Sequence, residues 1–272
     1  MQWRLPNKQI PLDRLCYLGV INLTPDSFSD GGCFLDPQQA ILQMEKLINQ
    51  GVHIIDIGAE STRPGYTPVD PKEEWARLAP IIDYYRKANL DCSLSVDTRH
   101  PEVARMSLDS GVDIINDISG CSNPEMTALV ANSDCGIIAV RSRIINGKIC
   151  LPDYEEPTPK TSEKAVSELI EVRDRLTSAG IKLERILLDL GFGFGTTYLE
   201  DQALWDSLPN LPEALNWPFE QFCIGISRKR YVARRFGVHG NMLLDKKTAE
   251  LEGLAIKMGY TVFRVHSVER EQ

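Results

Sequence analysis

The sequence contains no long apolar segment and no Cys-x-x-Cys motif, and its basic residues form no extended run. No run approaches the roughly 20 apolar residues of a membrane-spanning helix, and the N-terminal stretch MQWRLPNKQIPLDRL lacks the continuous apolar region of a secretory signal. We therefore expect no membrane association. Seven cysteines without a Cys-x-x-Cys pair favour a reducing compartment over a disulfide framework or a structural zinc site, so a cytoplasmic location is expected.

The overall charge is acidic, with a formal net charge of -8 at pH 7. A nucleic-acid surface needs clustered positive charge to contact phosphates, so no nucleic-acid partner is expected. An anionic small ligand would need local basic residues to bind against this field. With 272 residues and 43% hydrophobic content the chain can bury one large core, and we take residues 1–272 as a single domain.

Short apolar runs rich in β-forming residues alternate with segments of helical periodicity. The predicted strands are Cys16–Ile21, Ile54–Ile57, Cys92–Val96, Asp113–Asn116, Gly136–Val140, Arg185–Leu188, Phe222–Gly225 and Thr261–Val265. The predicted helices are Pro37–Gln50, Pro71–Lys87, Pro101–Asp109, Asn123–Ala131, Ser162–Ala179 and Lys246–Met258. This alternation over eight strands predicts an α/β fold of the (β/α)8 TIM-barrel type.

The main alternative fold is an open doubly wound sheet. That fold usually carries a Gly-x-Gly-x-x-Gly turn after its first strand, and no such turn follows Ile21, while GFGFG from Gly191 to Gly195 has the wrong spacing. Only Ser267 to Gln272 follow His266, which leaves open a barrel without a complete eighth helix. Such a barrel would expose apolar surface unless a partner subunit covered it, so a homodimer is left open.

Polar side chains stand where the predicted strands end. Such residues meet in one pocket, because parallel strands in a barrel end at the same face. A 2-amino-4-oxo pyrimidine edge, as in guanine or a pterin, fits Asp189 or Asp97 together with Asn116. Taken singly, each of these residues could equally be a helix N-cap or a turn former. In chain order the polar strand ends are Asn22, Asp56, Asp97, Asn116 with Asp117, Asp189, Lys229, Arg264 and His266.

Basic and amide side chains in the same set suit a phosphorylated ligand. Arg63, Lys229 and Arg264, with His266, could hold phosphate oxygens, which arginine binds in a bidentate manner. A lone histidine is more often structural than a ligand. The amide oxygen of Asn22 suits Mg²⁺, which keeps most of its water and bridges to substrate phosphates.

These residues lie in blocks that resemble the dihydropteroate synthases of the pterin-binding TIM-barrel superfamily. The blocks, in the order of that family, are GVINLTPDSFSDGG (Gly19 to Gly32), DIGAESTRPG (Asp56 to Gly65), SVDT (Ser95 to Thr98), IINDISG (Ile114 to Gly120), LLDLGFGFG (Leu187 to Gly195), GISRK (Gly225 to Lys229) and RVH (Arg264 to His266). The resemblance implies a transferase of folate biosynthesis. It would condense p-aminobenzoate with 6-hydroxymethyl-7,8-dihydropterin diphosphate to give 7,8-dihydropteroate and diphosphate.

The resemblance also implies a role for each matching residue. Catalysis would involve Asp97, Lys229 and Arg63, with Asp97 stabilising a pterin cation in an SN1-like reaction. The implied pterin contacts are Asp97, Asn116, Asp189 and Lys229. The implied diphosphate contacts are Asn22, Thr62, Arg63, Arg264 and His266, with Asn22 also at the Mg²⁺ cofactor. Phe28 and Pro64 would help to form the p-aminobenzoate pocket.

Three segments depart from the family pattern. The chain reads IIAVRSRIINGK from Ile137 to Lys148 where the family usually has a Met-His-Met-type run, and it carries Leu190 and Thr196 in place of a proline and a lysine. These departures keep a second hypothesis open, a repurposed or non-catalytic pterin-binding paralogue. A corrinoid-linked methyltransferase of the same superfamily is less favoured because it has no diphosphate to hold. A generic phosphate-sugar barrel enzyme would not explain the Asp and Asn set.

Overall fold

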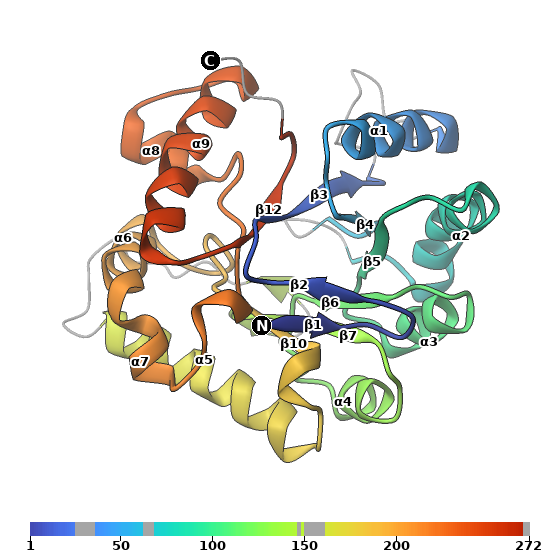
Figure 1. Cartoon of the computed structure of the whole chain (residues 1–272), viewed down its shortest axis with the longest axis horizontal. Helices are drawn as coiled ribbons and strands as arrows, with labels where there is room; N and C mark the ends of the chain where they lie inside the picture. The colour runs from blue at the N-terminus through green and yellow to red at the C-terminus, as the bar shows by residue number, and fades with distance from the viewer. Residues whose placement is uncertain (25–35, 62–67, 146–147, 150–160, 269–272) are drawn as a thin grey trace.

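Eight parallel strands close into a barrel in the computed structural model, which describes residues 1–24, 36–61, 68–145, 148–149 and 161–268 (Figure 1). Each strand pairs with the next along the chain, and the last pairs with the first. All eight predicted strands are confirmed to within two residues at each end. The barrel strands are β3 (Cys16–Asn22), β4 (Ile54–Gly58), β5 (Ser93–Asp97), β6 (Ile114–Asp117), β7 (Gly136–Val140), β10 (Ile186–Asp189), β11 (Phe222–Ile224) and β12 (Val262–Val265).

Helices surround the barrel (Figure 1). Proline begins α1, α2 and α4, and the preceding residue of each, Asp36, Asp70 or Asn123, accepts a hydrogen bond from the second helical amide. The helix predicted at Lys246–Met258 begins five residues earlier, and α6, α7 and α8 were not predicted. The helices are α1 (Pro37–Asn49), α2 (Pro71–Ala88), α3 (Pro101–Asp109), α4 (Pro124–Ala131), α5 (Thr161–Ser178), α6 (Tyr198–Ser207), α7 (Leu211–Leu215), α8 (Arg230–Phe236) and α9 (Asn241–Met258).

An antiparallel hairpin, β1 (Gln2–Arg4) and β2 (Gln9–Pro11), closes the amino-terminal end of the barrel. Its Trp3 is fully buried and packs in one apolar cluster with inward-facing strand residues such as Ile54 and Leu187. The Trp3 indole donates a 2.8 Å hydrogen bond to the Arg185 carbonyl. The hairpin was not predicted from the sequence, and it leaves the carboxyl ends of the strands as the face available to ligands.

Side chains on the barrel strands alternate between the interior and the helix layer. Ile54 and Leu187 lie in the interior cluster, whereas Ile55 and Leu188 lie in the outer core between strands and helices. The residues two positions after Ile54 and Leu187 therefore also face the interior, at the carboxyl end of the barrel. Those residues are Asp56 and Asp189, so the period of the strand brings polar groups to the mouth.

Two short strands, β8 (Ile144–Ile145) and β9 (Lys148–Ile149), pair in antiparallel fashion after β7. Within the described residues, which end at Val268, no helix follows β12. Among those residues there is also no helix with the length and apolar character needed to cross a membrane.

Candidate functional site

One guanidinium bridges two carboxylates at the barrel mouth. Arg264 on β12 donates from Nε to Asp56 Oδ2 and from Nη2 to Asp97 Oδ2, each at 2.6 Å. Asn116 on β6 donates to the same Asp56 oxygen at 3.0 Å. Asp56 and Asn116 are buried, and Asp97 and Arg264 are nearly so. The structure thus brings together three predicted site residues, Asp97, Asn116 and Arg264. It adds Asp56, for which the sequence indicated a strand end but no role.

Buried acceptor oxygens in this layer have unused hydrogen-bonding capacity. In the part of the chain that the structure describes, Asp56 Oδ1, Asn116 Oδ1 and the Ser95 hydroxyl have no hydrogen-bond partner. Buried polar atoms are normally paired, so such a group of atoms calls for an explanation. A ligand with several N–H donors would satisfy the acceptors, and an amino-substituted heterocycle is such a ligand.

Burial and charge shift the ionisation of this cluster. Burial raises the pKa of Asp97 to about 7, opposed by the positive charge of Arg264 and assisted by the negative charge of Asp56. Burial lowers the pKa of Arg264, but the two carboxylates outweigh it and hold that pKa above its usual range. Arg264 therefore stays charged, while Asp97 changes its charge near neutral pH.

A second cluster lies beside the first, because a Cβ atom added to Gly225 would lie 3.6 Å from the Cβ of Arg264. Lys229, the residue before α8, donates from Nζ to the Phe192 carbonyl at 2.6 Å and lies 3.8 Å from the centre of the Phe194 ring. A Cβ atom added to Gly225 would lie 3.2 Å from Asp189 Oδ2 and 3.9 Å from Lys229 Nζ. Burial lowers the pKa of Lys229 to about 8, although the Asp189 charge opposes the shift. Asp189 and Lys229 thus lie together, beside Gly225, where an added Cβ atom would crowd the Asp189 carboxylate.

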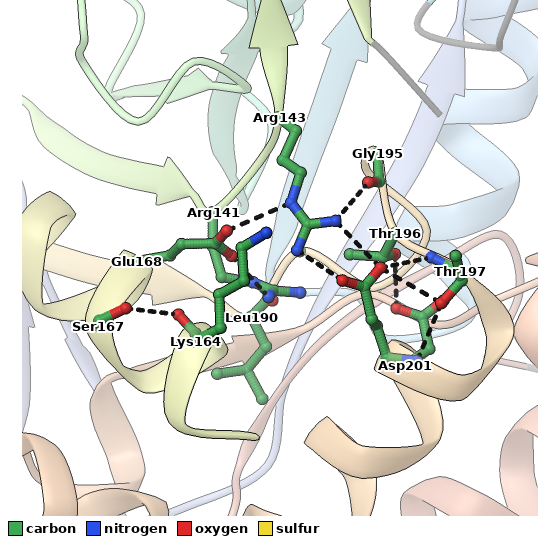
Figure 2. A network of polar contacts seen from close by, with 12 residues as sticks. Arg141, Arg143, Lys164, Ser167, Glu168, Leu190, Gly195, Thr196, Thr197 and Asp201 are labelled. Carbon is green, nitrogen blue, oxygen red and sulfur yellow. Dashed lines mark hydrogen bonds and ion pairs between the residues drawn. The ribbon is translucent and has the colours of Figure 1, made fainter. Parts of the chain in front are cut away.

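The segment after β7, which departs from the family pattern, keeps an apolar side chain at the mouth. Val140 forms a buried cluster with Ile118 and Phe194. The charge of the next residue, Arg141, is directed elsewhere, because Nε donates to the Leu190 carbonyl at 2.8 Å and Nη1 donates to Glu168 on α5 at 3.1 Å (Figure 2). These two bonds tie the guanidinium to the loop after β10 and to α5, while its Nη2 is buried without a hydrogen-bond partner among the described residues.

His266 lies just after β12, beside Ser227. Its Nδ1 is 3.0 Å from the Ser227 hydroxyl, and its backbone N–H donates to the same oxygen at 3.3 Å. Burial, with the positive charges of Arg228 and Arg264, lowers the pKa of His266 to about 3. The imidazole is therefore neutral at pH 7 and would meet an anion as a hydrogen-bond donor rather than as a cation.

Asn22 ends β3, next to Gly58 of β4 in the sheet register. Among the described residues, no group of three or more His, Cys, Asp or Glu side chains could hold a metal ion by itself. The five cysteines that the structure describes are buried and free. Four predicted site residues, Phe28, Thr62, Arg63 and Pro64, lie outside the described residues.

Known proteins with similar sequences and structures share one family. Residues 18–266 match the family described as pterin binding enzyme. The dihydropteroate synthase of Streptococcus pyogenes is 35% identical over 260 residues, which cover 94% of this chain and 91% of the relative. A probable bifunctional folylpolyglutamate synthase/dihydropteroate synthase of Halobacterium salinarum is 36% identical, and there the chain spans only 30% of the relative's length. A Xanthomonas albilineans dihydropteroate synthase structure with 4-aminobenzoic acid matches at a TM-score of 0.85 and 32% identity, over 98% of this chain and 94% of that one.

Proposed function

Because the chain belongs to the pterin binding enzyme family, we propose that it is a transferase that joins p-aminobenzoate to 6-hydroxymethyl-7,8-dihydropterin diphosphate. The products would be 7,8-dihydropteroate and diphosphate. The observation that carries the proposal is the convergence of two polar clusters at one barrel mouth, Asp56–Asp97–Arg264 and Asp189–Lys229. The folylpolyglutamate synthase activity named for the longer relative is not part of it.

The two clusters suit the two sides of a pterin. The Asp189 carboxylate can accept the N–H groups of the 2-amino pyrimidine edge, and the neighbouring Lys229 ammonium can donate to the 4-oxo group. Asn116 and Asp97 can accept from the remaining ring N–H groups. The apolar wall around Val140 supports a flat ring by contact. Together these contacts would hold the ring at the barrel mouth.

The proposed reaction breaks the bond between the pterin methylene carbon and the diphosphate oxygen, and that bond's electron pair leaves with diphosphate. The electron-poor methylene is stabilised by the Asp97 carboxylate, which is ionised above a pH of about 7. The neutral amine of p-aminobenzoate then attacks the methylene and loses a proton to solvent. No strong general base is needed, since the amine is already unprotonated at pH 7.

The structure describes some of the residues expected to contact the diphosphate, but not all of them. Neutral His266 supports a hydrogen bond to a diphosphate oxygen, and Arg264 could contribute N–H groups that the carboxylates do not use. Thr62 and Arg63, and with them the p-aminobenzoate contacts Phe28 and Pro64, stay predictions from the family pattern. So do the homodimer and the cytoplasmic location.

The described residues would offer Mg²⁺ one protein ligand. Asn22 supplies a single amide oxygen, and magnesium commonly takes few protein ligands and completes its shell with water and substrate phosphates. When bound, Mg²⁺ would neutralise charge on the leaving diphosphate. Asn22 is the residue proposed to hold it.

A repurposed paralogue is the second candidate, based on the altered segment after β7. The pairing of Arg141 with Glu168 and with the Leu190 carbonyl speaks against it. Competition by a sulfonamide, which mimics p-aminobenzoate, separates the two. In a diphosphate-release assay with both substrates and Mg²⁺, we expect the sulfonamide to raise the KM for p-aminobenzoate without changing the maximal rate. Diphosphate release that is insensitive to the sulfonamide would contradict the synthase proposal.

A further inference from the structure

One peptide group lies between Lys229 and a buried carboxylate. The peptide between Phe192 and Gly193 presents its carbonyl oxygen to Lys229 Nζ at 2.6 Å. The N–H of the same peptide is donated to Thr196 Oγ1 at 3.0 Å and to Asp201 Oδ1 at 3.2 Å. Because a trans peptide is planar, with its N–H and C=O pointing in opposite directions, the carboxylate and the ammonium lie at opposite ends of one dipole.

The acceptor end of this arrangement is built from buried groups. Thr196 and Asp201 are 2% and 3% exposed, and the threonine hydroxyl donates to Asp201 Oδ1 at 2.7 Å. Thr196 stands where the family usually has a lysine, so this chain has a hydroxyl where a cation is usual. The hydroxyl accepts the Gly193 N–H and at the same time orients the carboxylate that shares it.

The loop that carries this peptide is fixed on both sides. Arg143 donates to both Glu200 oxygens, at 2.8 and 3.0 Å. It also donates to the Gly195 carbonyl at 3.2 Å (Figure 2). The Arg143 N–H in turn donates to the Phe194 carbonyl. These contacts tie the segment after β7 and the start of α6 to the loop. The loop therefore offers Lys229 a set position rather than a variable one.

We propose that Thr196 and Asp201 are positioning residues for Lys229, acting through the Phe192–Gly193 peptide. The proposal rests on the proposed function, in which Lys229 contacts the pterin. A carboxylate hydrogen-bonded to an N–H polarises the peptide and makes its carbonyl a stronger acceptor, because hydrogen bonds in series strengthen one another. The ammonium is then held at one place and kept protonated beside the pterin, without Thr196 or Asp201 touching the substrate.

The proposal predicts a specific kinetic pattern. Thr196→Val keeps the shape but removes the hydroxyl, and Asp201→Asn removes the charge. Each should raise the KM for the pterin diphosphate about 5- to 10-fold, the loss expected for one buried hydrogen bond, with kcat and the KM for p-aminobenzoate little changed. Thr196→Ser, which restores the hydroxyl, should return the pterin KM to the wild-type value.

The charge of Lys229 gives an independent readout. Asp189 and Asp201 face it as anions, Arg264 faces it as a cation, and the Cys223 thiol also lies nearby. Removing the Asp201 charge should therefore shift the alkaline limb of pterin binding to lower pH. Labelling of Lys229 with an amine-reactive ester, followed by peptide mass spectrometry across pH, reports the same shift in the full-length protein without any turnover.

Ser107→Ala is the matched control, because Ser107 is buried on α3 and its hydroxyl donates to the Val103 carbonyl at 2.8 Å. If Thr196→Val and Asp201→Asn match this control in pterin KM and in the pH dependence of Lys229 labelling, the proposal is overturned. If Asp201→Asn fails to fold, the Thr196→Val and Thr196→Ser pair still decides. If wild-type protein forms no dihydropteroate, the proposed function fails, while the labelling result still tests the positioning.

Discussion

The substitution Asp97→Asn should separate stability from turnover at the barrel mouth. Asp97 accepts a 2.6 Å hydrogen bond from Arg264, and Arg264 donates a second hydrogen bond to Asp56. Burial raises the pKa of Asp97 from 3.8 to about 7, so folding disfavours the ionised carboxylate. At about 1.4 kcal/mol per pH unit, that cost reaches about 4 kcal/mol at pH 8.

Asparagine avoids this cost at nearly the same size. The raised pKa already includes the attraction of Arg264, so the loss of that attraction in the variant is not subtracted a second time. Asp97→Asn should therefore raise the free energy of unfolding at pH 8, by up to about 4 kcal/mol, and raise the Tm with it. Turnover should fall about 10²- to 10³-fold, because the variant lacks the charge that stabilises the developing pterin cation.

The pH dependence fixes the sign of the effect. A carboxyl whose pKa is higher in the folded state than in the unfolded state stabilises the fold at low pH, and that stability is lost as pH rises. The advantage of Asp97→Asn should therefore grow from a pH of about 4 to about 7 and level off above it. Thermal melting across this range and diphosphate-release kinetics measure the two effects. Unchanged turnover would refute the role in cation stabilisation, and a variant less stable than wild type at pH 8 would refute the electrostatic reasoning.

Three further predictions concern Lys229, Gly191 and His266. Burial lowers the pKa of Lys229 to about 8, so the affinity for the pterin, measured by calorimetry, should fall above that pH. Lys229→Arg should keep its pterin affinity to higher pH. An alkaline limb at the same pH in both proteins would contradict this. Gly191 has a φ of +72°, and an added Cβ would overlap the Arg141 carbonyl. Gly191→Ala should therefore lower the free energy of unfolding, measured in urea, by more than about 2 kcal/mol. A variant as stable as the wild type would contradict this loop geometry. Burial lowers the pKa of His266 to about 3, so its imidazole should stay neutral between pH 5 and 7. His266→Asn should therefore leave the fall of kcat/KM toward acid pH in that range unchanged. Loss of that fall in the variant would show that His266 titrates there.

The strands were predictable because a buried parallel strand is a short continuous apolar run, and each run here stops at a polar residue. The ion pair of Asp56 could not be predicted from the sequence. Its partner Arg264 is 208 positions away, so the pair exists only once β12 closes against β3. The signal that could have assigned Asp56 to the mouth is the two-residue period from inward-facing Ile54.

Other elements depend on contacts that a sequence does not display. The β1–β2 hairpin is short, and its position rests on burying Trp3 beneath the barrel and on the bond to the Arg185 carbonyl. Helix α8 spans seven residues with arginines that suggest a solvated face. Arg235 instead donates to Gln202 on α6 at 2.7 Å and to Tyr231 at 2.8 Å. In both cases distant residues decide the local structure.

We propose that this barrel mouth binds a pterin diphosphate and joins it to p-aminobenzoate. The most direct test is mass spectrometry of 7,8-dihydropteroate after incubation of the purified protein with both substrates and Mg²⁺. We predict product whose amount follows the protein concentration and which disappears in Lys229→Ala. Absence of product, with pterin binding still detected by calorimetry, would contradict the claim and favour a pterin-binding paralogue without this activity.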